Sequence, residues 1–267
     1  MERKKYPIRE NYYEEIKNKK LEEFYLVIQI ITVDLNLGEK AVLEKSKVYV
    51  MYGINVIGKK TILGLYVENK NNSRYWLDQI EKIKYRGLKK VLYVSMEENK
   101  KLEQALKIVY NPIIKTSITR DVEKIAEYVT RREWPSMQER KLIRAYLSET
   151  EEGYHEKIKE LKEEYKGNQL GIILLENFEK KFEKQIRDMP KEIRHLICSY
   201  SIRTHMKREL RNLEREYADI KDVEDLFEKK KEYFRTFERT RSYGKLEWME
   251  ILNKIYEEKY EEIKEYV

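Results

Sequence analysis

The sequence contains a single cysteine, Cys198, and lacks any apolar run of membrane length. One cysteine excludes an internal disulfide and any zinc site built from several cysteines, and it is typical of a reducing cytoplasm. A membrane-spanning helix needs about 20 mostly apolar residues. We therefore expect a cytoplasmic protein with no membrane partner. No apolar segment follows the basic start of the chain, so we also expect no secretory signal.

Glycine, proline and histidine are scarce as well, with nine, four and three copies. The chain has no P-loop, no G-x-G-x-x-G motif and no H-E-x-x-H motif, so the common nucleotide and zinc signatures are missing. His155, His195 and His205 lie far apart in sequence. A lone histidine is more often a surface or packing residue than a ligand. No internal repeat or Gly/Ser/Pro-rich linker divides the chain.

Charge, by contrast, is abundant: 39% of the residues are Asp, Glu, Lys or Arg, and the net charge is +7. A positive net charge attracts polyanions through long-range electrostatics and counterion release. Both signs are so frequent, however, that a solvated and highly charged surface explains the composition equally well. The abundance of Lys, Glu, Ile and Tyr is typical of hyperthermophile surfaces, which bears on habitat and not on chemistry.

Hydrophobic patterns predict an α/β protein, a mixed sheet with helices on its faces. Residues 24–33 form a continuous β-branched apolar run, typical of a strand buried on both faces, and Asp34–Gly38 is predicted to be a turn. A helix capped at Asn71–Ser73 and ended by Gly87 is expected next. From Asp121 onward the pattern is almost entirely helical. The remaining predicted elements are strands at 47–57, 60–67, 91–94 and 113–118 and a helix at 98–109.

Three motifs in sequence order resemble those of one family. Gly53–Val67 follows the pattern G-[IV]-N-x-x-G-x-K-x-x-L-G-L-[WY]. A helix with the pair Trp76-Leu77 and the ending Arg86-Gly87 comes next, and Met189–Arg194 looks like a Tyr-Pro-x-Glu-Ile-Arg segment. In order and spacing these motifs resemble the Mutator-type insertion-sequence transposases. The resemblance spans about residues 24–215.

This resemblance implies an RNase H-like fold with a D-D-E triad that binds two divalent metal ions. Such metals activate the attacking oxygen and neutralise the leaving one, and Mg²⁺ requires hard oxygen ligands. Long helical stretches are expected within and after the core. We divide the chain into an N-terminal helix or arm (1–23), an RNase H-like core (24–135), a helical insertion (136–190), a helix completing the core (191–216) and a C-terminal helical region (217–267).

The triad is not intact at the matching positions. The first Asp corresponds to Gln29, and a neutral amide binds Mg²⁺ more weakly than a carboxylate does. The second corresponds to Glu97, which is longer by one methylene group, and the third position falls on Thr204. Ser117 and Arg120 replace the family's Cys-x-x-His pair. We therefore expect no intact catalytic or metal site and no cofactor, with Mg²⁺ required only if activity survives.

Two alternatives stay open at this point. An active metal-dependent transposase or nuclease with rearranged acids would use Glu97 with Asp34 or Glu68. Asp34 lies five residues after Gln29, and an odd offset along a strand turns the side chain to the opposite face. Glu209 lies about 140° around the helix from the third position, so it is no simple replacement. The other alternative is a non-catalytic scaffold that binds protein partners.

Basic residues in the last third of the chain predict binding to double-stranded DNA, mainly to its phosphate backbone. In residues 229–245, Lys and Arg alternate with aromatic side chains, which suits nucleic-acid backbones and stacked bases. A helix with its aromatics in the core explains the same pattern. We expect a transposase-derived, nucleoid-associated protein that is unable to cut or join DNA. The predicted DNA-binding residues are Lys207, Arg208, Arg211, Arg215, Arg235, Arg239 and Arg241.

The final segment, 245–267, contains four Lys and seven Glu, and it does not resemble a DNA-binding arm. An apolar stripe at helical spacing runs along it. We expect this helix to pack on the body of the protein or to form a homodimer with a second copy. The stripe consists of Leu246, Met249, Leu252, Ile255 and Tyr256.

Overall fold

The computed structural model describes residues 11–39, 42–68, 74–129, 135–198, 200–217 and 219–266. The chain forms two compact units. The first comprises Met1–Val94, Glu98–Ile113 and Thr204–Ser242, and the second comprises Ser95–Glu97, Ile114–Arg203 and Tyr243–Val267. Among the described residues, no helix is long and apolar enough to cross a membrane.

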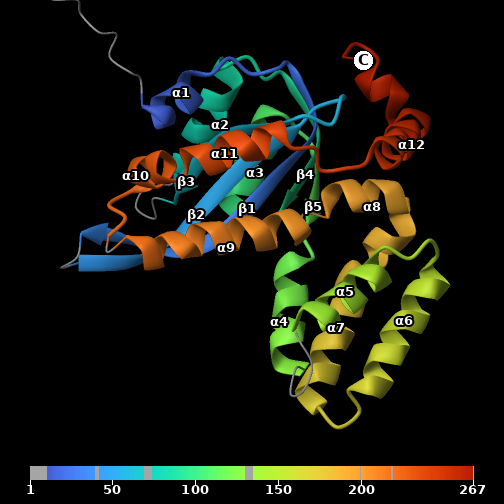
Figure 1. Cartoon of the computed structure of the whole chain (residues 1–267). Helices are drawn as coiled ribbons and strands as arrows, with labels where there is room; N and C mark the ends of the chain where they lie inside the picture. The colour runs from blue at the N-terminus through green and yellow to red at the C-terminus, as the bar shows by residue number, and fades with distance from the viewer. Residues whose placement is uncertain are drawn as a thin grey trace, which may run out of the picture. The chain divides into compact units, whose positions relative to one another are not determined.

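A five-stranded mixed sheet organises the α/β part of the fold, as the sequence predicts (Figure 1). Its strand order is β3-β2-β1-β4-β5. The first three strands form an antiparallel meander, and the apolar run that begins β1 is buried almost throughout. The strands are β1 (Phe24–Glu39), β2 (Val42–Ile54), β3 (Lys60–Val67), β4 (Lys90–Met96) and β5 (Ile113–Thr116).

The predicted turn at Asp34–Gly38 is wrong, because β1 continues through it to Glu39 and pairs with β2 from Val27 to Glu39. Leu35 and Leu37 are buried, while the polar residues between and before them are exposed. This alternation is the signature of a half-buried strand. Here the cross-strand packing outweighs the turn preference of Asp, Asn and Gly.

Helices of the first unit cover the sheet and flank it. α10 and α11 pack on β3, and α2 packs on α3 (Figure 1). The expected cap of α2 at Asn71–Ser73 lies outside the described residues, as do residues 1–10 of the N-terminal arm. The helices are α1 (Tyr12–Asn18), α2 (Tyr75–Tyr85), α3 (Lys100–Val109), α9 (Tyr200–Glu216), α10 (Val223–Lys229) and α11 (Lys231–Arg239); the first residues of α9 belong to the second unit.

The Gly-Ile-Asn motif builds the β2–β3 hairpin. A Cβ atom on Gly53 would lie 2.5 Å from Cδ1 of the buried Tyr25 ring, so only glycine lets the ring lie against β2. The side-chain oxygen of Asn55 accepts hydrogen bonds from the N–H groups of Ile57 and Lys59, at 3.2 and 2.9 Å. These contacts hold the turn closed.

The Arg-Gly pair that ends α2 also has a structural role. Arg86 donates from Nη1 to the carbonyl of Leu63 at 2.5 Å and from Nε to the carbonyl of Lys19 at 3.0 Å. Gly87 has a φ of 113°, which L side chains rarely adopt. The pair therefore joins the end of α2 to β3 and to the segment that precedes β1.

The second unit contains a helical bundle. α4, α5, α6 and α7 pack around buried aromatic residues that include Tyr154, Phe178 and Phe182 (Figure 1). Arg194, fully buried in α8, donates to the carbonyls of Met189, Tyr146 and Ser148, so its guanidinium is satisfied by backbone. The helices are α4 (Thr119–Val129), α5 (Pro135–Tyr146), α6 (Glu151–Glu164), α7 (Gln169–Asp188), α8 (Lys191–Ile197) and α12 (Lys245–Ile263).

The apolar stripe predicted for the last helix is partly wrong. α12 packs on α8 and buries Trp248, Ile251 and Ile255, whereas Leu246 and Met249 are exposed. The large indole ring defines the buried face, and residues three and seven positions after it follow on that face. Of the predicted stripe, Ile255 lies fully inside.

Lys60 is a lysine that is buried in the first unit. Its side chain starts β3 with only 4% exposure. The ammonium donates to Thr240 Oγ1 at 3.1 Å and lies 4.1 Å from the centre of the Phe237 ring. Burial lowers the pKa of Lys60 to about 8, because the charged form loses its hydration.

We predict that Lys60→Met stabilises the protein at pH 7 and that this advantage shrinks as the pH rises. Below pH 8 the wild-type lysine is charged in both the folded and the unfolded protein. Well above its unfolded pKa of about 10.4 it is neutral in both. Between these values the unfolded state binds more protons, so wild-type stability rises with pH by roughly 2–3 kcal/mol. Urea unfolding of both proteins at several pH values measures the difference.

The matched control is Lys59→Met, because Lys59 is exposed in the adjacent position. Its difference from wild type should stay constant over the same pH range. A Lys60→Met difference that is equally constant would contradict the prediction.

Candidate functional site

The carboxylate of Glu97, which the sequence analysis places at the family's second acid, contacts two arginines. Arg203 donates from Nη1 to Glu97 Oε1, and Nη1 of Arg120 lies 3.6 Å from Oε2. The side chains of Glu97 and Arg203 are 12% and 7% exposed, whereas that of Arg120 is 68% exposed. The Glu97–Arg203 ion pair is therefore largely buried within the second unit.

A second carboxylate shares the Arg203 guanidinium. Nε of Arg203 lies 3.7 Å from Oε1 of Glu123, which is one turn after Arg120 on α4. We call Glu97, Arg120, Glu123 and Arg203 the Glu97 cluster. Its two arginines and two glutamates give a formal charge of zero, so both carboxylates are compensated by protein groups alone.

The Cys-x-x-His positions contribute to the same region. Ser117 is buried, its hydroxyl lies 2.8 Å from that of Thr119, and its N–H donates to the carbonyl of Met96. Of these two residues, Arg120 is the one that contacts Glu97. Arg120 and Glu97, two residues at which the sequence analysis expects a departure from the family pattern, thus meet in one ion-pair cluster.

The other two triad positions lie in the first unit. Gln29 is in the middle of β1, is 1% exposed and stands opposite Tyr52 of β2. Thr204 is exposed on α9. Arg203, which precedes Thr204, is the functional candidate that the sequence analysis missed. The sequence signal for Arg203 was its place directly before Thr204, where the third acid of the triad is expected.

The alternative acids contact other groups. Glu68 accepts hydrogen bonds from Tyr49 Oη and Trp76 Nε1, both at 3.2 Å. Glu209 lies 3.7 Å from the ammonium of Lys230. Asp34 is exposed and lies opposite Lys47 in the β1–β2 ladder. In the part of the chain that the structure describes, none of these acids belongs to a group of three or more candidate metal ligands.

Predicted DNA-binding residues of α9 share an exposed face. Arg208, Arg211 and Arg215 are exposed and Lys207 is half-buried, while Met206, Leu210 and Leu213 are buried on the opposite side. Arg211 and Arg215 line a cleft of about 440 Å³. Its remaining lining residues are Asp34, Leu35, Asn36, Lys45 and Glu214.

A second basic cleft, of about 510 Å³, lies at the end of α11. Arg235, Arg239 and Arg241 line it together with Lys19, Lys59 and two glutamates. Arg235 is already paired with Glu15 at 3.0 Å and with Glu232 at 3.3 Å, and Lys19 is paired with Glu238 at 2.8 Å. For Lys59, Arg239 and Arg241, no ion-pair partner exists among the described residues. These three side chains carry the net positive charge of the cleft.

The aromatic residues between these basic groups belong mainly to the core. Phe234 and Phe237 are buried, and Tyr233 is half-buried and stacks on His205 with ring centres 5.6 Å apart. The basic-aromatic alternation of α11 therefore arises from amphipathic packing. Of its two interpretations, the structure favours the core over stacked bases.

Comparison with known proteins assigns the family. Residues 8–222 match the model for transposases of the Mutator family, so the chain belongs to that family. It is 25% identical over 117 residues to the transposase for insertion sequence element ISRM3 of Rhizobium meliloti (strain 1021), covering 43% of this chain and 29% of the relative. It is 24% identical over 134 residues to a probable insertion-sequence transposase of Corynebacterium diphtheriae, covering 50% and 37%. The chain thus matches well under half the length of these curated relatives.

We predict that Arg203→Met lowers the free energy of unfolding by about 3 kcal/mol, because it leaves two carboxylates with little solvent and without their shared partner. Adding Glu97→Gln should restore part of the loss, since the uncompensated charge disappears. Urea unfolding of the single and double variants measures both effects. Arg208→Met removes an exposed arginine from the same helix and should change stability by less than about 0.5 kcal/mol. Equal values for Arg203→Met and Arg208→Met would contradict the prediction.

Proposed function

We propose that this protein is a transposase-derived DNA-binding protein whose degenerate acidic triad cannot cut or join DNA. The observation that carries the proposal is the Glu97 cluster. There the carboxylate that matches the family's second acid is compensated by the guanidinium of Arg203, next to the third triad position.

The donor set supports this proposal. Phosphoryl transfer with two metal ions requires carboxylates that bind both ions. The two ions lie roughly 3.5–4 Å apart. The matching positions hold an amide at Gln29, an arginine-paired carboxylate at Glu97 and a hydroxyl at Thr204. A divalent cation at Glu97 would also be repelled by the guanidinium of Arg203. These residues do not fit a two-metal centre, and we derive no reaction step from one.

Basic surfaces of the first unit support DNA as the ligand. Arg211 and Arg215 line one cleft, and Lys59, Arg239 and Arg241 line the other. Phosphate contacts need spread-out positive charge and no acidic triad, so they can outlast the loss of metal ligands. A polar cleft lined by arginines suits the backbone of a duplex better than its bases.

The decisive prediction concerns binding and cleavage together. The full chain should bind a labelled duplex of arbitrary sequence with an affinity that falls steeply with salt, is indifferent to Mg²⁺ or Mn²⁺, and yields no nicked strand. Fluorescence anisotropy over a salt series, followed by denaturing gels, measures both properties. A metal-dependent nick would favour the active alternative, and absence of binding at low salt would favour the protein-interaction scaffold.

Replacing two cleft arginines should locate the binding surface. Arg211→Ala with Arg215→Ala should weaken binding about tenfold and reduce the salt slope by about two. The matched control is Lys159→Ala with Lys180→Ala, which removes the same charge from exposed positions on α6 and α7. If the control pair weakens binding equally, net charge and not the α9 surface is responsible.

A further inference from the structure

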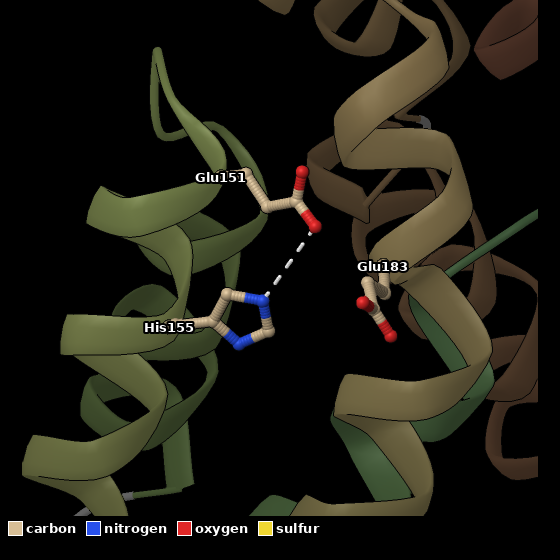
Figure 2. Close-up of side chains that lie close together, drawn as sticks. All are labelled: Glu151, His155 and Glu183. Atoms are coloured by element: carbon tan, nitrogen blue, oxygen red, sulfur yellow. Dashed lines mark ion pairs between the residues drawn. The ribbon is translucent and has the colours of Figure 1, made fainter.

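The helical bundle of the second unit contains a cluster of candidate metal ligands that lies outside the motifs shared with the transposase family. Glu151 and His155 lie one turn apart on α6, and Glu183 faces them from α7 (Figure 2). One ligand atom from each of the three lies within 4.8 Å of those of the other two. They are neither fully buried nor fully exposed, so ions can reach them from solvent.

The ring of His155 is oriented by a fourth side chain. Its Nδ1 lies 2.7 Å from Oε1 of Glu179, one turn before Glu183 on α7, and its Nε2 lies 3.9 Å from Oε1 of Glu151. Glu179 is held in turn by the ammonium of Lys162 at 2.5 Å. Metal-binding histidines usually carry such a carboxylate on the second ring nitrogen, which sets the tautomer and leaves the first nitrogen for the metal.

The backbone beneath the cluster is held by core packing. Tyr154, which precedes His155, is fully buried, and its hydroxyl lies 3.4 Å from the carbonyls of both Phe178 and Glu179. Phe178 and Phe182 are buried in the same core. The α6 and α7 positions are thus set independently of the polar cluster, and sites on packed helices keep their geometry better than sites on loops.

We propose that Glu151, His155 and Glu183 bind one divalent transition-metal ion of the zinc type, with Glu179 as the positioning residue for His155. One imidazole nitrogen and two carboxylate oxygens supply three ligands of a tetrahedral site and leave the fourth position to water. The imidazole selects zinc-type ions over Mg²⁺ and Ca²⁺, which prefer oxygen ligands alone.

Charge and distance both fit this occupant. Three carboxylates, one ammonium and a neutral imidazole leave a local charge of −2, which a divalent ion cancels. Tetrahedral zinc ligands lie about 3.3 Å apart when the metal–ligand bonds are near 2.0 Å. His155 Nε2 and Glu151 Oε1 are 3.9 Å apart, 0.6 Å more than this, and the ligand atoms of all three residues lie within 4.8 Å of one another. Rotation of partly exposed glutamate side chains closes such a gap without moving the helices.

Bound metal would join α6 to α7. A ligand that binds only the folded state adds stability that grows with the logarithm of its concentration relative to the dissociation constant, so zinc should raise the melting temperature of the chain. This inference is independent of the proposed DNA-binding function, since the clefts that carry that proposal are in the first unit and this cluster is in the second.

The test is a zinc titration of the full chain after chelator treatment, against a chromogenic zinc indicator. We expect one zinc ion per chain and at least tenfold weaker binding for His155→Gln and Glu183→Gln. Glu179→Gln should also weaken binding about tenfold through the ring orientation. Circular dichroism checks that each variant is folded, which the partial exposure of these side chains favours.

Three controls make the result specific to this cluster. Glu152→Gln makes the same charge change at the exposed neighbour of Glu151, His205→Gln removes an exposed histidine of the first unit, and Cys198→Ser removes the one thiol. All three should bind zinc as wild type does. A thermal melt with and without zinc should show equal stabilisation in wild type and in these controls, and a smaller one in His155→Gln.

Either of two outcomes would overturn the proposal. One is a wild-type chain that takes up less than half an equivalent of zinc at about 100 µM free metal, where a site with a micromolar dissociation constant is saturated. The other is a stoichiometry and affinity that His155→Gln and Glu183→Gln leave unchanged, which would place the bound zinc elsewhere.

Discussion

A carboxylate removed from water requires a positive charge beside it, and at Glu97 that charge is a guanidinium. In a two-metal enzyme the compensating charge is the metal itself, which the active site can bind and exchange. Arg203, by contrast, is part of the chain, so this compensating charge cannot be exchanged. The pair joins the residue that follows β4 to the start of α9, and Arg120 and Glu123 add α4 to the same contact. One electrostatic requirement thus holds three segments of the second unit together.

The motifs in which this sequence resembles its family stabilise the fold. Gly53 makes room for the Tyr25 ring, Asn55 closes the β2–β3 turn, and Arg86 joins α2 to β3 by two backbone carbonyls. Arg194 of the Pro-x-Glu-Ile-Arg segment is buried with its guanidinium on three backbone carbonyls. An unsatisfied buried arginine would be costly, so these positions tolerate little change whether or not the protein acts on DNA. Sequence resemblance therefore supports the fold more strongly than the activity.

The parts of the structure that could be predicted from sequence are those that depend on local patterns. The apolar run at the start of β1 and the hairpin up to β3 follow from period and turn chemistry. The Asp34–Gly38 extension could not be predicted by turn propensity, because its strand state depends on pairing with β2. Arg203 and Glu97 are 106 residues apart, so no local pattern connects them. At α6 and α7, by contrast, a signal was present: Glu151 and His155 have helical spacing, and so do Glu179 and Glu183. Considered one at a time, however, the three histidines give no indication of this cluster.

Three charge arrangements within this chain separate structural from binding roles. The Glu97 cluster is neutral, with each charge matched inside the protein, so it has little to offer a ligand. The cluster on α6 and α7 has a charge of −2 around an oriented imidazole, which suits a divalent cation; its members are Glu151, His155, Lys162, Glu179 and Glu183. The clefts beside α9 and α11 contain arginines that lack carboxylate partners among the described residues, which suits phosphate. Ligands bind where protein charges are left uncompensated, because there the attraction is not already satisfied. By that criterion, the α6–α7 side chains and the two basic clefts, and not the Glu97 cluster, are the places where the two proposals made for this chain have their physical basis.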